Sequence, residues 1–220
     1  ILQEFAANAT AGGSYYGGVD SGDTQDCINE QNLPIASITP RRIEDISNVK
    51  QLSGGYGHLL WLTDAGQLWS WGCNQYAQLG REKTFNSQNT RTPAPVTSVK
   101  DKTFSQISAG FRHSTAIDNE GVIWAWGHNG ATEVNSTNEG SVQVPTKVST
   151  SETASNVSAG FDATVIQNKS GALLAVGDNT ARRLVNSDNA TVRDYATVTP
   201  QASVFVLGRD SILYTDTLND

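Results

Sequence analysis

The sequence predicts an all-β chain made of repeated units of antiparallel sheet, and two observations predict it. One pattern occurs three times, at residues 52–74, 107–129 and 157–179, with offsets of 55 and then 50 residues. Each copy holds two short apolar and aromatic runs joined by a polar connection that ends in Gly, which is a β-hairpin signal. A fixed period of this length is typical of supersecondary units that stack on one another.

The repeat divides the chain into an extension and a repeat domain. Residues 1–39 do not fit the pattern, and they form either a linker from a preceding domain or a segment that completes a unit. Residues 40–220 form the repeat domain, with full units at 40–94, 95–144 and 145–191 and a partial unit at 192–220. The change in offset falls wholly between Leu79 and Pro95, so this segment is predicted to be a loop.

Within the units, hairpins are predicted at residues 58–72, 113–127 and 163–177. Trp69 and Trp71 share one face of their strand because side chains alternate along a strand. Together with Trp124 and Trp126, they are expected to pack between units. In the partial unit, residues 204–207 and 212–214 predict one more short hairpin.

Charge and hydropathy exclude two classes of protein. The formal net charge is −7, whereas a general nucleic-acid binder needs a basic face. No apolar run approaches the length of a membrane span. We therefore expect no nucleic-acid partner and no membrane-spanning segment.

The chain has two cysteines, Cys27 and Cys73. Cys73 follows a strand-ending Gly, which predicts an edge position rather than a core position. The even count favours a Cys27–Cys73 disulfide, and two free thiols are the alternative. Because disulfides persist in oxidising compartments and exposed free thiols are usually avoided, the pair favours an extracellular or cell-surface protein.

The sequence offers no catalytic constellation, cofactor motif or complete metal site. His58 and His113 occupy equivalent repeat positions, where the third unit has Ala163, so they are predicted to be structural histidines that hydrogen-bond between strands. His128 and Asp178 could meet, but two ligands are fewer than the three or four that a metal site needs. We therefore expect no enzyme activity, no cofactor and no metal.

The repeated residues resemble those of a known family. Pro40, the Ser-x-Gly-Tyr-x-His of residues 53–58, the Leu-Trp-x-Trp-Gly-x-Asn of residues 68–74 and the Gln-Leu-Gly of residues 78–80 are similar to the repeats of the regulator of chromosome condensation family. The resemblance implies a β-propeller with four-stranded antiparallel blades, here a partial or small ring. Residues 1–39, a second chain or further parts of a longer polypeptide would complete it.

Residues that break the repeat are the better candidates for function, because the architecture does not require them. This combination favours a non-enzymatic, adhesin-like binding module, extracellular on a cell surface or pilus tip, that recognises a protein or a glycan, with self-association or additional domains completing the ring. The resemblance also implies two alternatives, a secreted enzyme inhibitor and a guanine-nucleotide exchange factor for a small GTPase. The predicted ligand-binding residues lie in the inter-unit loops and are Tyr76, Arg81, Lys83, Asn86, Asn135 and Asn138.

Overall fold

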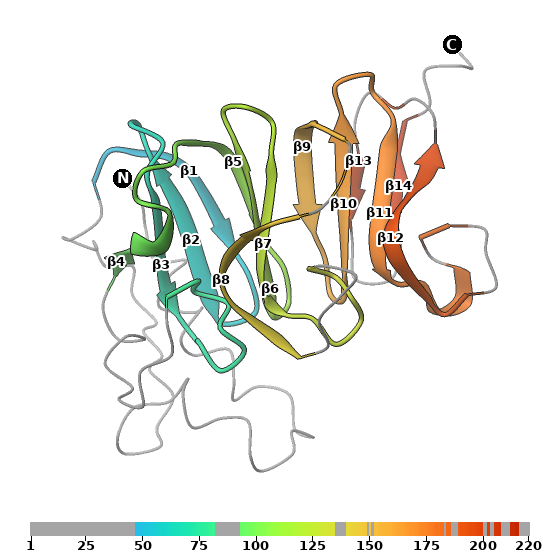
Figure 1. The fold of residues 1–220 in the computed structure, drawn as a ribbon, viewed down its shortest axis with the longest axis horizontal. Coiled ribbons are helices and arrows are strands. Elements are labelled where there is room, and N and C mark those ends of the chain that lie inside the picture. Colours follow the sequence, from blue (N-terminus) through green and yellow to red (C-terminus); the bar gives the residue numbers. More distant parts are fainter. Residues whose placement is uncertain are drawn as a thin grey trace, which may run out of the picture.

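The computed structural model shows three four-stranded antiparallel sheets and one two-stranded hairpin. It describes residues 47–81, 93–134, 140–148, 150, 152–182, 184–185, 189–199, 202, 205–207 and 212–215. The sheets stand side by side in sequence order, like the blades of a propeller (Figure 1). This confirms the all-β fold and the three predicted hairpins.

The strands follow the repeat. The first sheet contains β1 (Val49–Gly54), β2 (His58–Thr63), β3 (Leu68–Gly72) and β4 (Ala94–Pro95). The second contains β5 (Phe104–Ala109), β6 (His113–Asp118), β7 (Ile123–His128) and β8 (Ser141–Lys147). The third contains β9 (Ala154–Ala159), β10 (Ala163–Asn168), β11 (Leu173–Asp178) and β12 (Thr191–Thr199). The hairpin is β13 (Phe205–Leu207) with β14 (Ile212–Tyr214), and two short 3-10 helices lie at Thr97–Val99 and Thr180–Arg182.

The last strand of each sheet lies across the boundary between two sequence units. β4 holds residues 94–95, β8 holds 141–147 and β12 holds 191–199, so the boundaries drawn at 94/95, 144/145 and 191/192 fall inside these strands. Each sheet therefore takes part of its outer strand from the unit that follows. This sharing ties consecutive units together through backbone hydrogen bonds.

The first strands of the sheets lie next to one another and are joined by side chains. Gln51 donates from Nε2 to the Ile107 carbonyl at 3.0 Å and accepts the Ile107 N–H at 3.1 Å. The Ser53 hydroxyl accepts the Ala109 N–H at 2.9 Å, and Ser108 repeats this bond to the Ala159 N–H at 2.9 Å. The recurring polar residues of these strands thus satisfy backbone groups of the next sheet.

Apolar side chains fill the space between sheets. One cluster contains Leu60 and Leu62 from the first sheet, Trp126 from the second and Ile166 from the third. A second cluster joins the third sheet to the final hairpin through Val165 and Phe205. The core is therefore a series of layers between neighbouring sheets, as the stacking of repeats requires.

The two repeat-position histidines are structural, as predicted. His58 Nε2 lies 2.9 Å from Ser114 Oγ, and His113 Nε2 lies 3.0 Å from Thr164 Oγ1, and both rings are fully buried. Glycine makes room for each ring, because a Cβ at Gly55 would lie 2.3 Å from His58 Cε1. Each histidine joins its own sheet to the next one.

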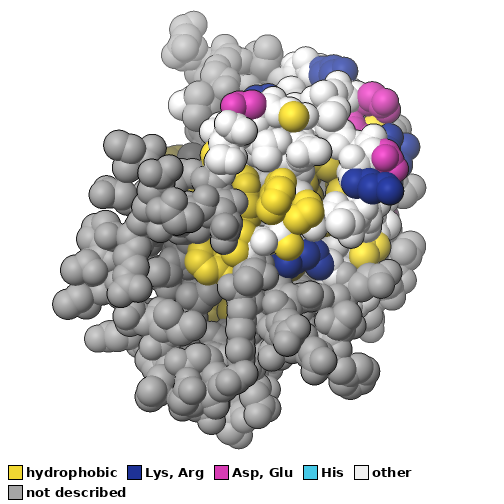
Figure 2. All heavy atoms as spheres, turned by 90° about the vertical axis from the view of Figure 1, so that its left-hand side faces the viewer, with side chains coloured by type: hydrophobic (Ala, Val, Ile, Leu, Met, Phe, Trp, Pro, Cys, Tyr) yellow, Lys and Arg dark blue, Asp and Glu magenta, His cyan; other side chains and the backbone are white. Residues whose placement is uncertain are grey.

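The four tryptophans do not share one environment. Trp126 is fully buried between the first and second sheets. Trp69 and Trp71 pack instead in a separate cluster with Leu59 and Trp61, on the face of the first sheet that points away from the second. Hydrophobic side chains gather on this end of the array (Figure 2). What lies against this face falls outside the described residues, so packing of Trp69 and Trp71 between units stays a prediction.

Of the two cysteines, only Cys73 lies among the described residues. Cys73 is buried rather than at an exposed edge, and its N–H donates to the Gly57 carbonyl at 2.7 Å. It is not a free thiol. Cys27 and the whole extension 1–39 lie outside the described residues, so the Cys27–Cys73 pairing stays a prediction. No helix in the described part of the chain is long and apolar enough to cross a membrane.

Candidate interaction rim

The turns and loops at one end of the three sheets form a continuous surface, which we call the rim. It consists of the turns at 55–57, 110–112 and 160–162 and the loops at 73–81, 129–134 and 179–182. A repeated backbone bond holds each loop against its turn: His128 N–H donates to the Arg112 carbonyl at 2.9 Å, and Asp178 N–H donates to the Asp162 carbonyl at 2.8 Å. The sequence position that follows each strand-ending Gly is therefore fixed at the rim.

A buried asparagine shapes each loop. Asn74 Oδ1 accepts the Leu79 N–H at 3.0 Å, and Asn129 Oδ1 accepts the Val134 N–H at 2.9 Å. Asn179 Oδ1 accepts the Leu184 N–H at 2.9 Å in the third unit. This explains why Gly-x-Asn and a later aliphatic residue recur together. The loops are held in defined shapes, so the side chains that they carry are preorganised.

Three aromatic rings from equivalent turns stack along the rim. Tyr56 and Phe111 have ring centroids 4.5 Å apart, and Phe111 and Phe161 have centroids 4.0 Å apart with nearly parallel planes. Backbone bonds between the turns set this spacing, since the Phe111 N–H donates to the Gly160 carbonyl at 2.8 Å. Tyr56 is 39% exposed, and the other two rings are half-buried. The stack is thus a partly exposed aromatic strip that crosses three sheets.

Arg112 connects this strip to the loop of the first unit. Its Cζ lies 4.8 Å from the centroid of Phe111 and 4.6 Å from the centroid of Tyr76. The Tyr76 ring meets His128 edge to face, with centroids 5.1 Å apart. Cation–π contacts of this kind hold the guanidinium in place between the two rings.

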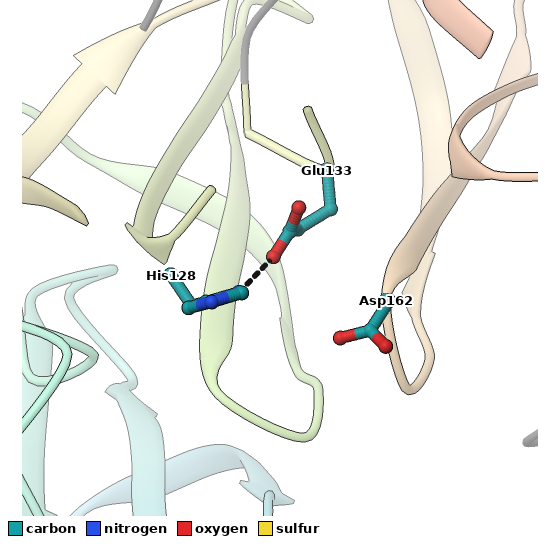
Figure 3. Close-up of side chains that lie close together, drawn as sticks. All are labelled: His128, Glu133 and Asp162. Carbon is teal, nitrogen blue, oxygen red and sulfur yellow. Dashed lines mark hydrogen bonds and ion pairs between the residues drawn. The ribbon is translucent and has the colours of Figure 1, made fainter. Parts of the chain in front are cut away.

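A histidine and two carboxylates lie beside Arg112 and Tyr76. His128 Nδ1 is 2.5 Å from Glu133 Oε1, and Asp162 reaches toward this pair from the turn of the third sheet (Figure 3). The three ligand-type atoms all lie within 4.8 Å of one another. His128 ends β7 and Glu133 lies in the loop that follows it, whereas Asp162 comes from the neighbouring sheet. The cluster therefore depends on the packing of two sheets.

The electrostatics of the two carboxyl groups differ. Burial works to raise the pKa of Glu133, but the hydrogen bond with His128 and the nearby His113 lower it below its ordinary value. For Asp162, burial and then the repulsion of Glu133 raise the pKa above its ordinary value, against the opposing influence of His128 and Arg112. Glu133 is thus held as a carboxylate, and Asp162 is the group that gains most from an added positive charge.

These three side chains could in principle hold a divalent cation, since His and carboxylate groups are zinc ligands. Both oxygens of Glu133 are already engaged, one with His128 and the other with the Ala131 N–H at 2.8 Å. Arg112 also supplies positive charge near Asp162. The arrangement suits recognition of charged and aromatic groups better than it suits a metal.

The structure brings only some of the predicted site residues to the rim. Tyr76 lies there, in contact with Arg112 and His128. Arg81 ends the same loop, and burial lowers its pKa to about 10. Lys83, Asn86, Asn135 and Asn138 lie outside the described residues, so their roles stay predictions.

Sequence reasoning missed Arg112, Glu133 and Asp162. It paired His128 with Asp178, whereas the structure places His128 against Glu133 and near Asp162. One signal could have found two of them: the position two residues after the turn glycine is Gly57, Arg112 and Asp162 in the three units, and so it breaks the repeat just as Tyr76 does.

Comparison with known proteins identifies the repeat. A model of the regulator of chromosome condensation (RCC1) repeat matches residues 65–117. A second RCC1 repeat model matches residues 49–78 and 104–131. The matched segments cover the first sheet and most of the second.

Curated relatives match the same part of the chain. The ultraviolet-B receptor UVR8 of Arabidopsis thaliana is 32% identical over 120 residues, which are 54% of this chain and 24% of the relative. The probable E3 ubiquitin-protein ligase HERC6 of Homo sapiens is 38% identical over 97 residues, 43% of this chain and 9% of the relative. The chain thus spans about a quarter or less of the length of these relatives.

Solved structures extend the likeness to the fold. Prp20p from Saccharomyces cerevisiae superposes with a TM-score of 0.71 at 20% identity, over 86% of this chain and 48% of Prp20p. Human WBSCR16 gives a TM-score of 0.69 at 20% identity, over 77% of this chain and 45% of that chain. The chain therefore carries repeats of the regulator of chromosome condensation (RCC1) family, matched over residues 49–131, on the fold of an RCC1 β-propeller.

Proposed function

We propose that this chain is a non-enzymatic protein-binding module and that the rim is its recognition surface. The observation that carries the proposal is the strip formed by Tyr56, Phe111 and Phe161 with Arg112 and Tyr76 beside it. Tyrosine and arginine dominate the energetics of protein interfaces, and rigid aromatic groups lose little entropy on binding. A preorganised strip of this kind is a suitable anchor for a partner.

The charge pattern of the rim defines the chemistry of the partner. The cationic Arg112 lies next to the half-buried Asp162, whose carboxyl group can accept from a cationic side chain of a partner. A protein segment with an apolar or aromatic residue flanked by charged groups of both signs fits this arrangement. A glycan ligand and a location outside the cell remain predictions from composition and from the cysteine pair.

The names of the related proteins support a binding role without choosing the partner. A receptor and a ubiquitin ligase share this repeat. Prp20p is described by its binding to Gsp1p and histones, and another structure contains yeast RCC1 with Kap60. Protein partners recur among these relatives, which favours a protein over a glycan. They also favour the exchange-factor alternative over the secreted inhibitor.

The test measures binding of the purified chain to three probes: Gsp1p, histones and a glycan array. Arg112→Ala and Tyr76→Ala should each weaken binding to a protein probe by about 1–3 kcal/mol, the range for a hot-spot side chain. Lys169→Ala removes an exposed charge at the opposite end of the third sheet and serves as the matched control. Binding that both rim variants leave unchanged would show that recognition lies elsewhere.

A nucleotide assay separates the exchange-factor alternative from plain binding. Release of a fluorescent guanine nucleotide from Gsp1p is followed with and without the chain. Acceleration that Arg112→Ala abolishes would support exchange through the rim. Binding without acceleration would leave the binding module as the proposal and remove exchange.

A further inference from the structure

Three rim positions of the repeat change from uncharged to acidic along the chain. In the first unit these positions hold uncharged residues, which are Gly57, Cys73 and Gln78. Near the junction of the second and third sheets, the same positions hold the carboxylates Glu133, Asp162 and Asp178. The aromatic strip runs over all three sheets, and so one end of it lies beside acidic groups that the other end lacks at the equivalent positions.

The architecture does not require the charge of Glu133. Its Oε2 accepts the Ala131 N–H at 2.8 Å, and in the first unit Gln78 Oε1 accepts the Tyr76 N–H at the same distance. An uncharged side chain therefore shapes the loop equally well. Glu133 is fully buried, and a buried carboxylate costs desolvation energy even when it is paired with His128. The added charge thus points to a role beyond the shape of the loop.

The three carboxylates differ in how they are engaged. Both oxygens of Glu133 are bonded, and Asp178 Oδ1 accepts the N–H and the hydroxyl of Thr180, at 2.7 and 2.5 Å. The described residues act on the Asp162 carboxyl group through charge alone, without a hydrogen bond (Figure 3). Asp162 is half-buried, on the turn that also carries Phe161. It is therefore the carboxylate whose oxygens can receive a ligand, and the other two add negative potential around it.

A cationic side chain fits this environment better than a metal ion. A structural metal site needs about three or four protein ligands, whereas one carboxylate in a negative potential is enough for a charge-assisted hydrogen bond. A guanidinium suits the place better than an ammonium, because it is planar, more weakly hydrated and stacks on aromatic rings. The rim already shows such packing, since Arg112 Cζ lies 4.8 Å from the centroid of Phe111, on which Phe161 stacks.

We propose that the rim binds an extended protein segment that places an arginine at Asp162 and an apolar side chain against Tyr56 and Phe111. This inference rests on the proposed function, because it identifies the chemistry of the partner for the same surface. Ring centroids 4.5 and 4.0 Å apart lead from Tyr56 through Phe111 to Phe161, next to Asp162 in the chain. In an extended segment, side chains on one face lie roughly 6.5 Å apart, so the two partner residues are two positions apart.

The test compares capped pentapeptides that differ in a single side chain. Each peptide has a phenylalanine and, two positions away, an arginine, a lysine or a citrulline, which is the uncharged isostere of arginine. Their dissociation constants for the purified chain are measured by NMR titration. The arginine peptide should bind at least about fivefold more tightly than the citrulline peptide, and more tightly than the lysine peptide, because its hydrogen bonds to Asp162 are charge-assisted and bidentate.

Asp162→Asn keeps the shape of the side chain and removes its charge. The variant should bind the arginine and citrulline peptides equally well, and its unfolding temperature should not fall, because repulsion from Glu133 and Asp178 is relieved. Asp101→Asn is the matched control. It removes an exposed carboxylate from the loop before β5, at the end of the sheets opposite the rim, and should leave the preference for arginine unchanged.

The ratio of the peptide dissociation constants tests this inference, whereas binding to Gsp1p and histones tests the proposed function. A chain that binds a protein probe but does not distinguish arginine from citrulline would overturn this inference and leave the binding function standing. A preference for arginine that Asp162→Asn removes, without binding to either protein probe, would support this inference and count against those two proteins as partners.

Four further outcomes would overturn the proposal. The first is that no peptide binds at millimolar concentration, and the second is that the lysine peptide binds as tightly as the arginine peptide. The third is an Asp162→Asn variant that unfolds at a lower temperature and also loses the citrulline peptide, which would make Asp162 a structural residue. The fourth is stoichiometric binding of Zn²⁺ or Ca²⁺ to the EDTA-treated chain that Asp162→Asn abolishes, which would make this place a metal site.

Discussion

The first and second sheets carry the same tryptophan pair at the same repeat positions, and the two pairs have different environments. Trp126 is enclosed between two sheets and donates to the Gln78 carbonyl. Trp71 is half-buried on the outer face of the first sheet, and its indole N–H has no partner among the described residues. Equivalent residues of the repeat therefore have different environments, and the difference depends on what packs against their face of the sheet.

The largest expected effect on stability comes from truncating each of these two tryptophans. Trp126→Ala removes a fully buried ring and should lower the free energy of unfolding by about 3–5 kcal/mol. Trp71→Ala should cost roughly 1–2 kcal/mol, because a half-buried ring loses less contact area. Chemical denaturation in dilute solution measures both values. Equal losses would mean that a covered junction also exists at the first sheet under those conditions.

The buried histidines predict the next largest effect, a loss of stability in acid. Burial lowers the pKa of His58 to about 3 and that of His113 to about 4, with repulsion from His113 adding to the shift of His58. The unfolded state therefore binds more protons below its pKa of about 6.5. The stabilisation is present above pH 6.5 and is lost as the pH falls toward 4 and then 3.

By pH 5.5 the two histidines together should remove roughly 2–3 kcal/mol from the free energy of unfolding. His113→Ala copies the third unit, which has Ala163 at this position, and should reduce the slope of stability against pH to about half. The slope, rather than the absolute stability, is the quantity to compare, because the variant also leaves a cavity. A slope that the variant does not change would contradict the assignment.

The turn glycines allow the backbones of neighbouring sheets to approach closely. A Cβ at Gly110 would lie 2.6 Å from the Gly160 carbonyl oxygen of the next sheet, whereas a Cβ at Gly54 would meet nothing within 4 Å. Gly110→Ala should therefore cost roughly 1–3 kcal/mol, since the junction must shift to make room. Gly54→Ala is the matched control and should change little. Thermal unfolding of both variants decides the matter, and equal midpoints would contradict the close approach.

The sequence predicts the sheets well because their signals are local. Alternating apolar residues and a turn Gly placed the hairpins at 58–72, 113–127 and 163–177, where the structure has them. The register of the repeat also identified His58 and His113 as structural. These inferences need only neighbouring residues and a period.

The rim and the outer face are less predictable because they depend on how sheets stack. Tyr76 was found because it breaks the repeat, but the contact between Asp162 and the loop of the second unit needs the distance between two sheets. Alternation places Trp69 and Trp71 on one face and gives no information about what covers it. Arg112 looks like an ordinary surface residue until the rings on either side of it are in place.

The smallest expected effect is that of removing the Ser114 hydroxyl, which has no counterpart in the first sheet. Ser114 accepts from His58 and donates to the Gln78 carbonyl, whereas Leu59 has the same position in the first sheet. Ser114→Ala should cost about 1–2 kcal/mol, because the buried His58 N–H loses its acceptor while the Gln78 carbonyl keeps the Trp126 N–H.

A double-mutant cycle isolates this bond from the packing around it. His58→Ala removes the donor, so adding Ser114→Ala to that variant should cost less than it does in the unmodified chain, with a coupling of about 1 kcal/mol. The hairpin junction already works with an apolar residue at the histidine position, since Ala163 packs there with Phe205. Strictly additive losses would mean that histidine and serine act independently. In that case the choice between Leu59 and Ser114 would reflect side-chain volume alone.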